Sequence, residues 1–164
     1  MDLIAHFRMM ARYNRIANER LYAQCALLED AEYRKTRPGS FGSIHGLLNH
    51  ILLGDRRWLA LWEAGKRETP VLSQILYDEF AALRAARERE DAHLEEFFSS
   101  RDAAFFARSF SYVNNKGREC ADTGHTSAAH LFNHQTHHRG QVHVMLSQTS
   151  VPPPSLDLHR IINP

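Results

Sequence analysis

The chain has 164 residues, a length that predicts a single domain over residues 1–164 with room for a hydrophobic core. A formal net charge of +1 argues against a nucleic-acid partner or an anionic membrane surface, and no apolar run reaches the roughly 20 residues of a membrane span. Asp2 and His6 fall within a helical pattern, so the first residues lack the layout of a signal peptide. Cys25 and Cys120 are too few for a disulfide framework, and we therefore expect a reduced, cytoplasmic setting.

Residues 1–28 form the first predicted helix. Its apolar side chains recur at alternating steps of three and four, a heptad-like spacing typical of lengthwise helix packing: Leu3, Phe7, Met10, Ala17, Leu21 and Leu28. Asn14 and Gln24 interrupt this stripe, and we interpret both as polar residues that set the helix register rather than as part of a polar centre. Residues 34–42 follow with one proline and two glycines, which predicts a loop.

Residues 43–64 form the second predicted helix, which ends at Gly65. It has a broad apolar face made of Ile44, Leu47, Leu48, Ile51, Leu52, Trp58, Leu59 and Trp62. His50 lies at the edge of this face, and His45 lies on a different face of the same helix. Gly54, one turn after His50, weakens a helix, which suggests a position where space is needed.

Residues 68–71 predict a short connection, and residues 72–98 form the third predicted helix. Its inward-facing positions are apolar: Leu72, Ile75, Leu76, Phe80, Leu83, Leu94, Phe97 and Phe98. Residues 84–91 alternate in charge between these positions. We interpret them as a solvated helix face with ion pairs at i, i+4.

Residues 105–122 lose the helical period. Aromatic residues alternate before the turn sequence Asn-Asn-Lys-Gly at residues 114–117, which predicts a two-stranded hairpin. Residues 127–148 form the last predicted helix. The three consecutive prolines after it forbid further helix, and we expect residues 151–164 to form an extended tail.

The last predicted helix carries the sequence Asn-His-Gln-Thr-His-His-Arg-Gly-Gln at residues 133–141. His134 and His138 are one helical turn apart, so their imidazoles stand one above the other and can bind one metal ion. Apolar neighbours indicate that this helix is half-buried, and buried imidazoles need partners. His50 is our candidate for a third ligand, and His45, on a different face of the same helix, is an alternative. The same spacing, extended back to His130 in a chain with 11 histidines, also fits a polar stripe in solvent.

Three stretches together resemble the DinB/YfiT-like superfamily of metalloenzymes. They are Ser-Ile-His-Gly-Leu-Leu-Asn-His at residues 43–50 with Trp58 further along, the string at residues 133–141, and Tyr13-Asn14 near the start. The resemblance covers nearly the whole chain, including the predicted hairpin. It implies an all-α fold, an up-down-down-up four-helix bundle with a short β-hairpin between the third and fourth long helices. It also implies frequent assembly as a homodimer.

The resemblance implies a metal site as well. The family's three metal ligands fall on His50, His134 and His138 of this sequence. Members of the family usually hold zinc or nickel, with water completing the coordination shell. Characterised branches use a low-molecular-weight thiol as cofactor in S-transfer or isomerisation reactions.

Three neutral imidazoles leave a divalent ion its full charge, so an open fourth position acidifies a bound water or holds a substrate thiolate. We therefore expect an enzyme acting on a small molecule, either a hydrolase or a thiol-dependent S-transferase. Asn49, Arg139 and Gln141 are candidates for supporting the ligands, and Arg139 also for pairing with a substrate anion or a neighbouring carboxylate. Asp55 we interpret as surface or helix-packing polarity.

A structural metal site is the alternative interpretation. A fourth protein ligand such as His137 or His6 would close the coordination shell and leave a site that only ties two helices together. The protein would then be a dimeric stress-response or binding module, with the apolar tail and the aromatic hairpin as contact surfaces. An open coordination position next to a cavity favours an enzyme instead.

Overall fold

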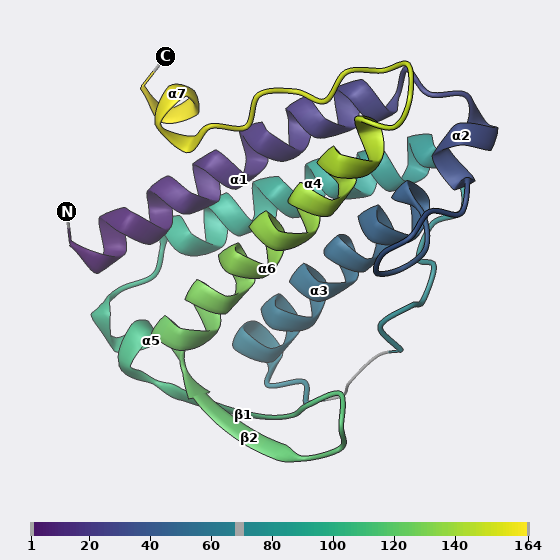
Figure 1. Ribbon diagram of the computed structural model, residues 1–164. Helices are drawn as coiled ribbons and strands as arrows, with labels where there is room; N and C mark the ends of the chain where they lie inside the picture. The colour runs from purple at the N-terminus through teal and green to yellow at the C-terminus, as the bar shows by residue number, and fades with distance from the viewer. Residues whose placement is uncertain (1, 68–70, 164) are drawn as a thin grey trace.

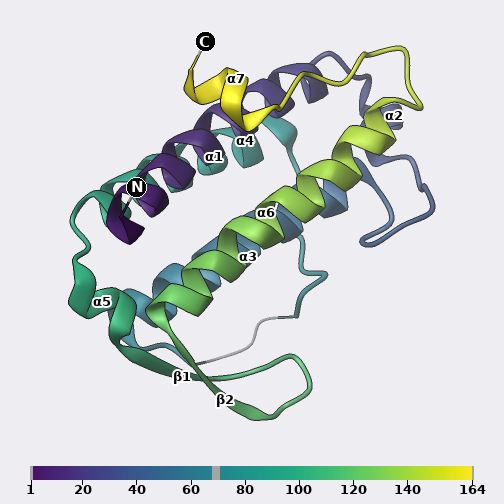
Figure 2. The ribbon, with the colours of Figure 1, turned by 60° about the vertical axis from the view of Figure 1, so that its left-hand side comes forward.

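Four long helices form the body of the computed structural model, which describes residues 2–67 and 71–163. They are α1 (Leu3–Cys25), α3 (Ile44–Ala64), α4 (Phe80–Ser99) and α6 (Gly124–Leu146). Helices α1 and α3 each pack against both α4 and α6. Helices α1 and α6 run in one direction and α3 and α4 in the other (Figures 1 and 2). In the described part of the chain, no helix combines the length and apolar character that a bilayer crossing requires.

Three short helices and a two-stranded hairpin complete the fold of the described residues. They are α2 (Asp30–Arg34), α5 (Ala103–Ala107), α7 (Leu158–Ile162), and the strands β1 (Ser109–Val113) and β2 (Glu119–Thr123). Helix α7 packs against the middle of α1. The strands pair antiparallel, with Ser111 opposite Ala121. They lie at the end of the molecule where α3 ends and α6 begins (Figure 1). The mostly helical class with one two-stranded hairpin, expected from the sequence, is therefore confirmed.

Several predicted boundaries were wrong at the short elements. The hairpin was expected over residues 105–122, but residues 103–107 form helix α5, because the Asp102 side chain accepts the Phe105 N–H and caps it. The tail over residues 151–164 was expected to be extended throughout, but it ends in α7. The first helix stops at Cys25 rather than at residue 28, and the separate helix α2 follows it.

The third long helix also starts later than predicted. The sequence pattern placed its start at residue 72, but α4 begins at Phe80. The side-chain oxygen of Asn49 accepts the backbone N–H groups of both Leu76 and Tyr77, so these residues bond to α3 instead of opening a helix. The expected connection at residues 68–71 lies, except for Val71, outside the described residues.

The two other long helices match their predictions more closely. Helix α3 begins after Ser43, whose hydroxyl accepts the Gly46 N–H at 3.0 Å, and ends at Gly65 in the left-handed conformation. Helix α6 begins three residues before the predicted residue 127, because Thr123 at the end of β2 caps it through the Thr126 N–H.

A layer of buried polar side chains divides the hydrophobic core. Along each long helix, apolar residues of one core cluster precede the polar residues and apolar residues of another follow them. The layer comprises Asn14 and Asn18 on α1, Asp55 on α3, Arg87 and Asp91 on α4, and Gln135 and Arg139 on α6, each at most 3% exposed. Two predictions were therefore wrong: residues 84–91 are not simply a solvated face, and Asn14 does belong to a polar centre. Arg87 and Asp91 share a helix face with the buried Leu83 and Leu94, because the four positions are spaced i, i+4, i+8 and i+11.

Candidate metal centre

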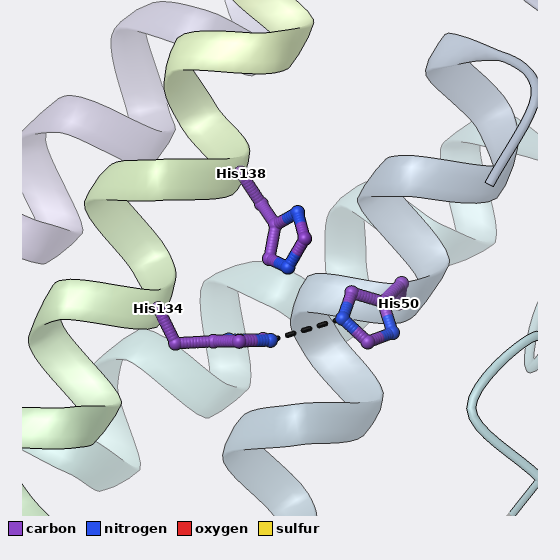
Figure 3. A group of neighbouring side chains, drawn as sticks. All are labelled: His50, His134 and His138. Atoms are coloured by element: carbon purple, nitrogen blue, oxygen red, sulfur yellow. Dashed lines mark hydrogen bonds between the residues drawn. The ribbon is translucent and has the colours of Figure 1, made fainter. Parts of the chain in front are cut away.

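Three histidines from two helices meet at the α3–α6 interface (Figure 3). His134 and His138 lie one turn apart on α6, and His50 faces them from α3. One ring nitrogen of each residue lies within 4.8 Å of one from both others, and the Nε2 atoms of His50 and His134 are 2.9 Å apart. His50 and His138 are buried, and His134 is half-buried. Three imidazole nitrogens, all supplied by helices, thus converge on one point.

Hydrogen bonds fix which nitrogen each of two rings presents. His50 Nδ1 lies 3.0 Å from the backbone carbonyl of Leu72, which only accepts, so Nδ1 carries the proton and Nε2 has the lone pair. His138 Nδ1 lies 2.7 Å from the side-chain oxygen of Gln141, which orients that ring in the same way. Each ring therefore turns an unprotonated Nε2 toward the common point, as a ligand must.

The donor set fits a divalent transition metal. Two nitrogens bound to one tetrahedral zinc at about 2.0–2.1 Å lie about 3.3 Å apart, a few tenths of an ångström more than the His50–His134 separation. Imidazole nitrogen suits zinc, nickel, copper and iron alike. Of the histidine, cysteine and carboxylate side chains in the described residues, these three histidines are the ones that lie close enough together, as a group of three, to hold a metal ion.

Burial keeps the three imidazoles neutral. It lowers the pKa of His50 to about 4, against the opposing effect of the Leu72 carbonyl. It lowers the pKa of His134 to about 3, with the neighbouring histidines adding to the shift. The pKa of His138 also falls through burial, although its bond to Gln141 opposes the change. Neutral imidazole is the form that binds metal, so at neutral pH the site needs no deprotonation of imidazolium.

Two neighbours shape the space around the rings. A Cβ atom on Gly54 would lie 2.8 Å from Cε1 of His134, so the absence of a side chain there makes room for that ring, as the sequence suggested. The Phe41 ring stacks on His50 with centroids 3.7 Å apart and an interplanar angle of 16°. Phe41 has a φ of 60°, a conformation that is unusual for a bulky residue and that marks a functional constraint when it occurs beside a site.

A cavity of about 470 Å³ adjoins the three histidines. Helices α3 and α6, the loop before α3, and the hairpin supply its walls, including Phe41, Arg57, Trp58, Tyr112, Asn115 and His130. Cavities of this size hold small molecules, and most bind them through apolar walls and a few polar groups. The histidine cluster therefore opens onto a space that a small molecule can occupy.

The sequence model of one protein family matches this chain from residue 4 to residue 164. That family is described as the DinB family. The chain belongs to the DinB family. A comparison with curated proteins found no significant match. The family assignment agrees with the resemblance that residues 43–50 and 133–141 carry.

Two of the predicted supporting residues in this DinB-family protein contact either a histidine of the triad or the chain segment that bonds to one. Gln141 accepts from His138 and also approaches Ser40 in the loop before α3. Asn49 does not touch the triad, but it holds the backbone at Leu76 and Tyr77 in the connection that also supplies the Leu72 carbonyl. Asn49 thus acts on His50 through the chain between α3 and α4.

Arg139 lies away from the cavity, and Asp55 has the helix-packing place that was one of its two interpretations. Arg139 is buried on the core side of α6 and donates to side chains of the polar layer, so it does not line the cavity to pair with a substrate anion. Asp55 is fully buried in the same layer, and it belongs to helix packing rather than to the surface.

The alternative ligands considered from the sequence stay outside the cluster. His45 lies 3.2 Å from the Tyr77 carbonyl, and His137 is exposed beside Gln141. His6 is partly exposed near the start of α1 and packs against Phe7. His130 lines the cavity one turn before His134, with the two ring centroids 6.0 Å apart.

Sequence reasoning missed the residues that approach the site from loops and the hairpin. Phe41, Leu72 and Tyr112 contact the triad or its cavity only because of tertiary packing, and no local pattern marks them. Gln135 could have been recognised from the sequence as a polar residue buried behind the histidines. It lies inside the histidine string, directly after His134, on the face of α6 that turns toward the core.

Proposed function

We propose that this DinB-family protein is a metal-dependent enzyme that acts on a small molecule. One divalent ion, zinc or nickel, is bound by His50, His134 and His138. The observation that carries the proposal is the convergence of three neutral imidazoles beside a cavity of about 470 Å³. A structural zinc site has four protein ligands, whereas three protein ligands next to a cavity are typical of a catalytic one.

The protein's part in the chemistry follows from its contacts. A bound divalent ion supplies Lewis acidity and lowers the pKa of a water or thiol that reaches it. Leu72 and Gln141 orient two of the rings through their Nδ1–H groups. Phe41 covers one face of His50 and excludes water from that side. These residues support hydrolysis or thiol-dependent S-transfer, the latter with a low-molecular-weight thiol as cofactor.

The substrate is a molecule with an apolar body and an anionic group. Phe41, Trp58 and Leu53 supply the apolar part of the cavity wall. Arg57 supplies a cationic side chain, and none of the cavity-lining residues within the described ranges is acidic. The Arg57 guanidinium donates to the Val113 carbonyl at 2.7 Å, and burial lowers the pKa of Arg57. A substrate anion beside the guanidinium would raise that pKa.

Trp58 in the cavity wall provides a reporter for this preference. In titrations followed by tryptophan fluorescence, 3-phenylpropanoate should bind at least about tenfold more tightly than the neutral 3-phenylpropanamide. Arg57→Gln should abolish the difference and Arg57→Lys should keep part of it. Arg56→Gln, which removes the same charge from the adjacent residue outside the cavity wall, is the matched control and should leave it intact. Equal binding of acid and amide would refute an anionic substrate.

The rest of the proposal concerns the setting of the enzyme. We infer the family's up-down-down-up four-helix bundle and a homodimer, supported by the family assignment and the directions of the long helices. A cytoplasmic location is supported by the two cysteines, which are unpaired in the described chain. The near-neutral net charge supports a small-molecule substrate rather than a nucleic-acid or membrane partner.

Metal analysis of tag-free protein tests the proposal. The wild-type protein should contain about one divalent ion per chain, and His138→Ala should lose it. His137→Ala is the matched control, because it removes an exposed imidazole from the adjacent position and should keep the metal. Full occupancy in His138→Ala would exclude the proposed ligand set.

A structural metal site in a dimeric stress-response or binding module is the second candidate. It is favoured by the position of the cluster between α3 and α6, which one ion would tie together. Removing the metal would then lower the melting temperature sharply, and no thiol adduct or ester in a substrate screen would be turned over.

A further inference from the structure

The buried polar layer reaches α6 directly behind the histidines. Asp55 on α3 accepts from Arg87 on α4 at 2.6 Å and from the side-chain amide of Gln135 on α6. A single carboxylate oxygen therefore ties three of the long helices together. Because none of these side chains is more than 2% exposed, water does not offer a replacement partner for a broken bond.

Arg139 continues the layer toward α1. Its guanidinium donates to the side-chain oxygens of Gln135 at 3.0 Å, Asn18 at 3.2 Å, and Asn14. The amide groups of Asn14 and Asn18 in turn donate to Asp91 on α4, and Asp91 pairs with Arg87 at 3.0 Å. The contacts thus form a closed circuit through all four long helices.

The formal charges in this circuit balance. Arg87 pairs directly with Asp55 and Asp91. Arg139 is linked to the same carboxylates through the amides of Gln135, Asn14 and Asn18. Sliding α6 by one residue along its axis, or turning it by the corresponding 100°, would leave buried charges unpaired. The circuit therefore specifies one rotation and one height of α6 against its neighbours.

Each circuit residue on α6 directly follows a histidine of the triad. Gln135 follows His134, and Arg139 follows His138, so the imidazoles face the cavity while the next side chains face the core. On α3, Asp55 likewise follows Gly54, the residue that makes room for the His134 ring. We propose that Gln135 and Arg139 are positioning residues for the metal centre, which hold α6 where its two histidines meet His50. This inference rests on the proposed metal site.

Cobalt uptake provides a test with a readout of geometry. Gln135→Met keeps the side-chain length and removes both of its hydrogen bonds in the circuit. Wild-type protein loaded with Co²⁺ should show the visible absorption bands of a bound ion, and Gln135→Met should shift these bands and bind Co²⁺ about tenfold more weakly. Arg139→Lys, which keeps the charge but removes the planar guanidinium whose Nη1 makes all three bonds, should show the same change and serves if Gln135→Met does not fold.

Ser127→Ala is the matched control. Ser127 accepts the Trp62 indole N–H at 3.1 Å, so this change also removes a buried bond between α3 and α6, but two turns away from His134. It should lower the denaturation midpoint while leaving the cobalt bands and affinity unchanged. Unaltered bands in both circuit variants, or equal shifts in Ser127→Ala, would overturn the inference. A wild-type protein that takes up no Co²⁺ would instead refute the proposed function, so the two failures are distinguishable.

Discussion

Gly54→Ala separates the stability of the helix from the geometry of the metal centre. Glycine inside a helix is less favourable than alanine by about 0.8–1.0 kcal/mol, so the substitution by itself stabilises α3. The new Cβ would lie 2.8 Å from Cε1 of His134, whereas ordinary contact begins at 3.4 Å. The ring must therefore move by the difference, 3.4 − 2.8, or about 0.6 Å.

This displacement is large on the scale of metal coordination. Ligand distances in metal sites vary by about 0.2 Å, so a ring moved by about three times as much no longer meets the ion in the preferred geometry. We expect the affinity for Zn²⁺ to fall about 10–100-fold, which corresponds to about 1.4–2.7 kcal/mol. The metal-free protein should keep its stability or gain up to about 1 kcal/mol, a rise in melting temperature of up to roughly 4 °C.

Two measurements on the same samples decide this prediction. Competition with a chromogenic chelator gives the Zn²⁺ affinity, and urea denaturation of the metal-free protein gives the free energy of unfolding. Gly140→Ala is the control, because Gly140 lies on α6 near His138 and a Cβ there meets nothing within 4 Å. It should stabilise the metal-free protein and leave the affinity unchanged. Wild-type Zn²⁺ affinity in a stable Gly54→Ala protein would show that this glycine does not control the His134 ring.

Three further predictions concern protonation and burial. Because burial lowers the pKa of all three histidines, the affinity for Zn²⁺ should change little between about pH 7.5 and about pH 6. Three ordinary imidazoles would lose about 50-fold in Zn²⁺ affinity over this range through proton competition. A loss of that size in a chelator titration would contradict the neutral-imidazole site. Phe41→Gly should raise the pKa of His50 from about 4 toward 6.5 in an NMR titration of metal-free protein, since burial is the main cause of the shift and glycine accepts the positive φ; an unchanged pKa would mean that Phe41 does not shield this ring. Arg87→Met should destabilise the protein by about 3–5 kcal/mol in urea denaturation, because it leaves two buried carboxylates without their shared partner; a cost below about 1 kcal/mol would show that the pair is not buried as described.

The sequence by itself determined the features that depend on local spacing. The four apolar-periodic segments correspond to the four long helices, and α3 begins at the predicted cap Ser43 and ends at the predicted Gly65. The spacing of His134 and His138 placed them on one face, because the pitch of a helix alone sets that relation. The role of Gly54 was also visible, because glycine in a helix needs a local reason.

Only the tertiary structure decided which distant residues meet. His50 reaches His134 across 84 positions of sequence, and the Leu72 carbonyl reaches His50 because Asn49 draws the chain before α4 away from helix formation. Residues 84–91 have the charge pattern of a solvated face, yet Arg87 and Asp91 are buried, because partners on α1 and α3 replace the water that they lose. Local periodicity specifies the face on which a side chain lies, and the packing of all four helices decides what that face meets.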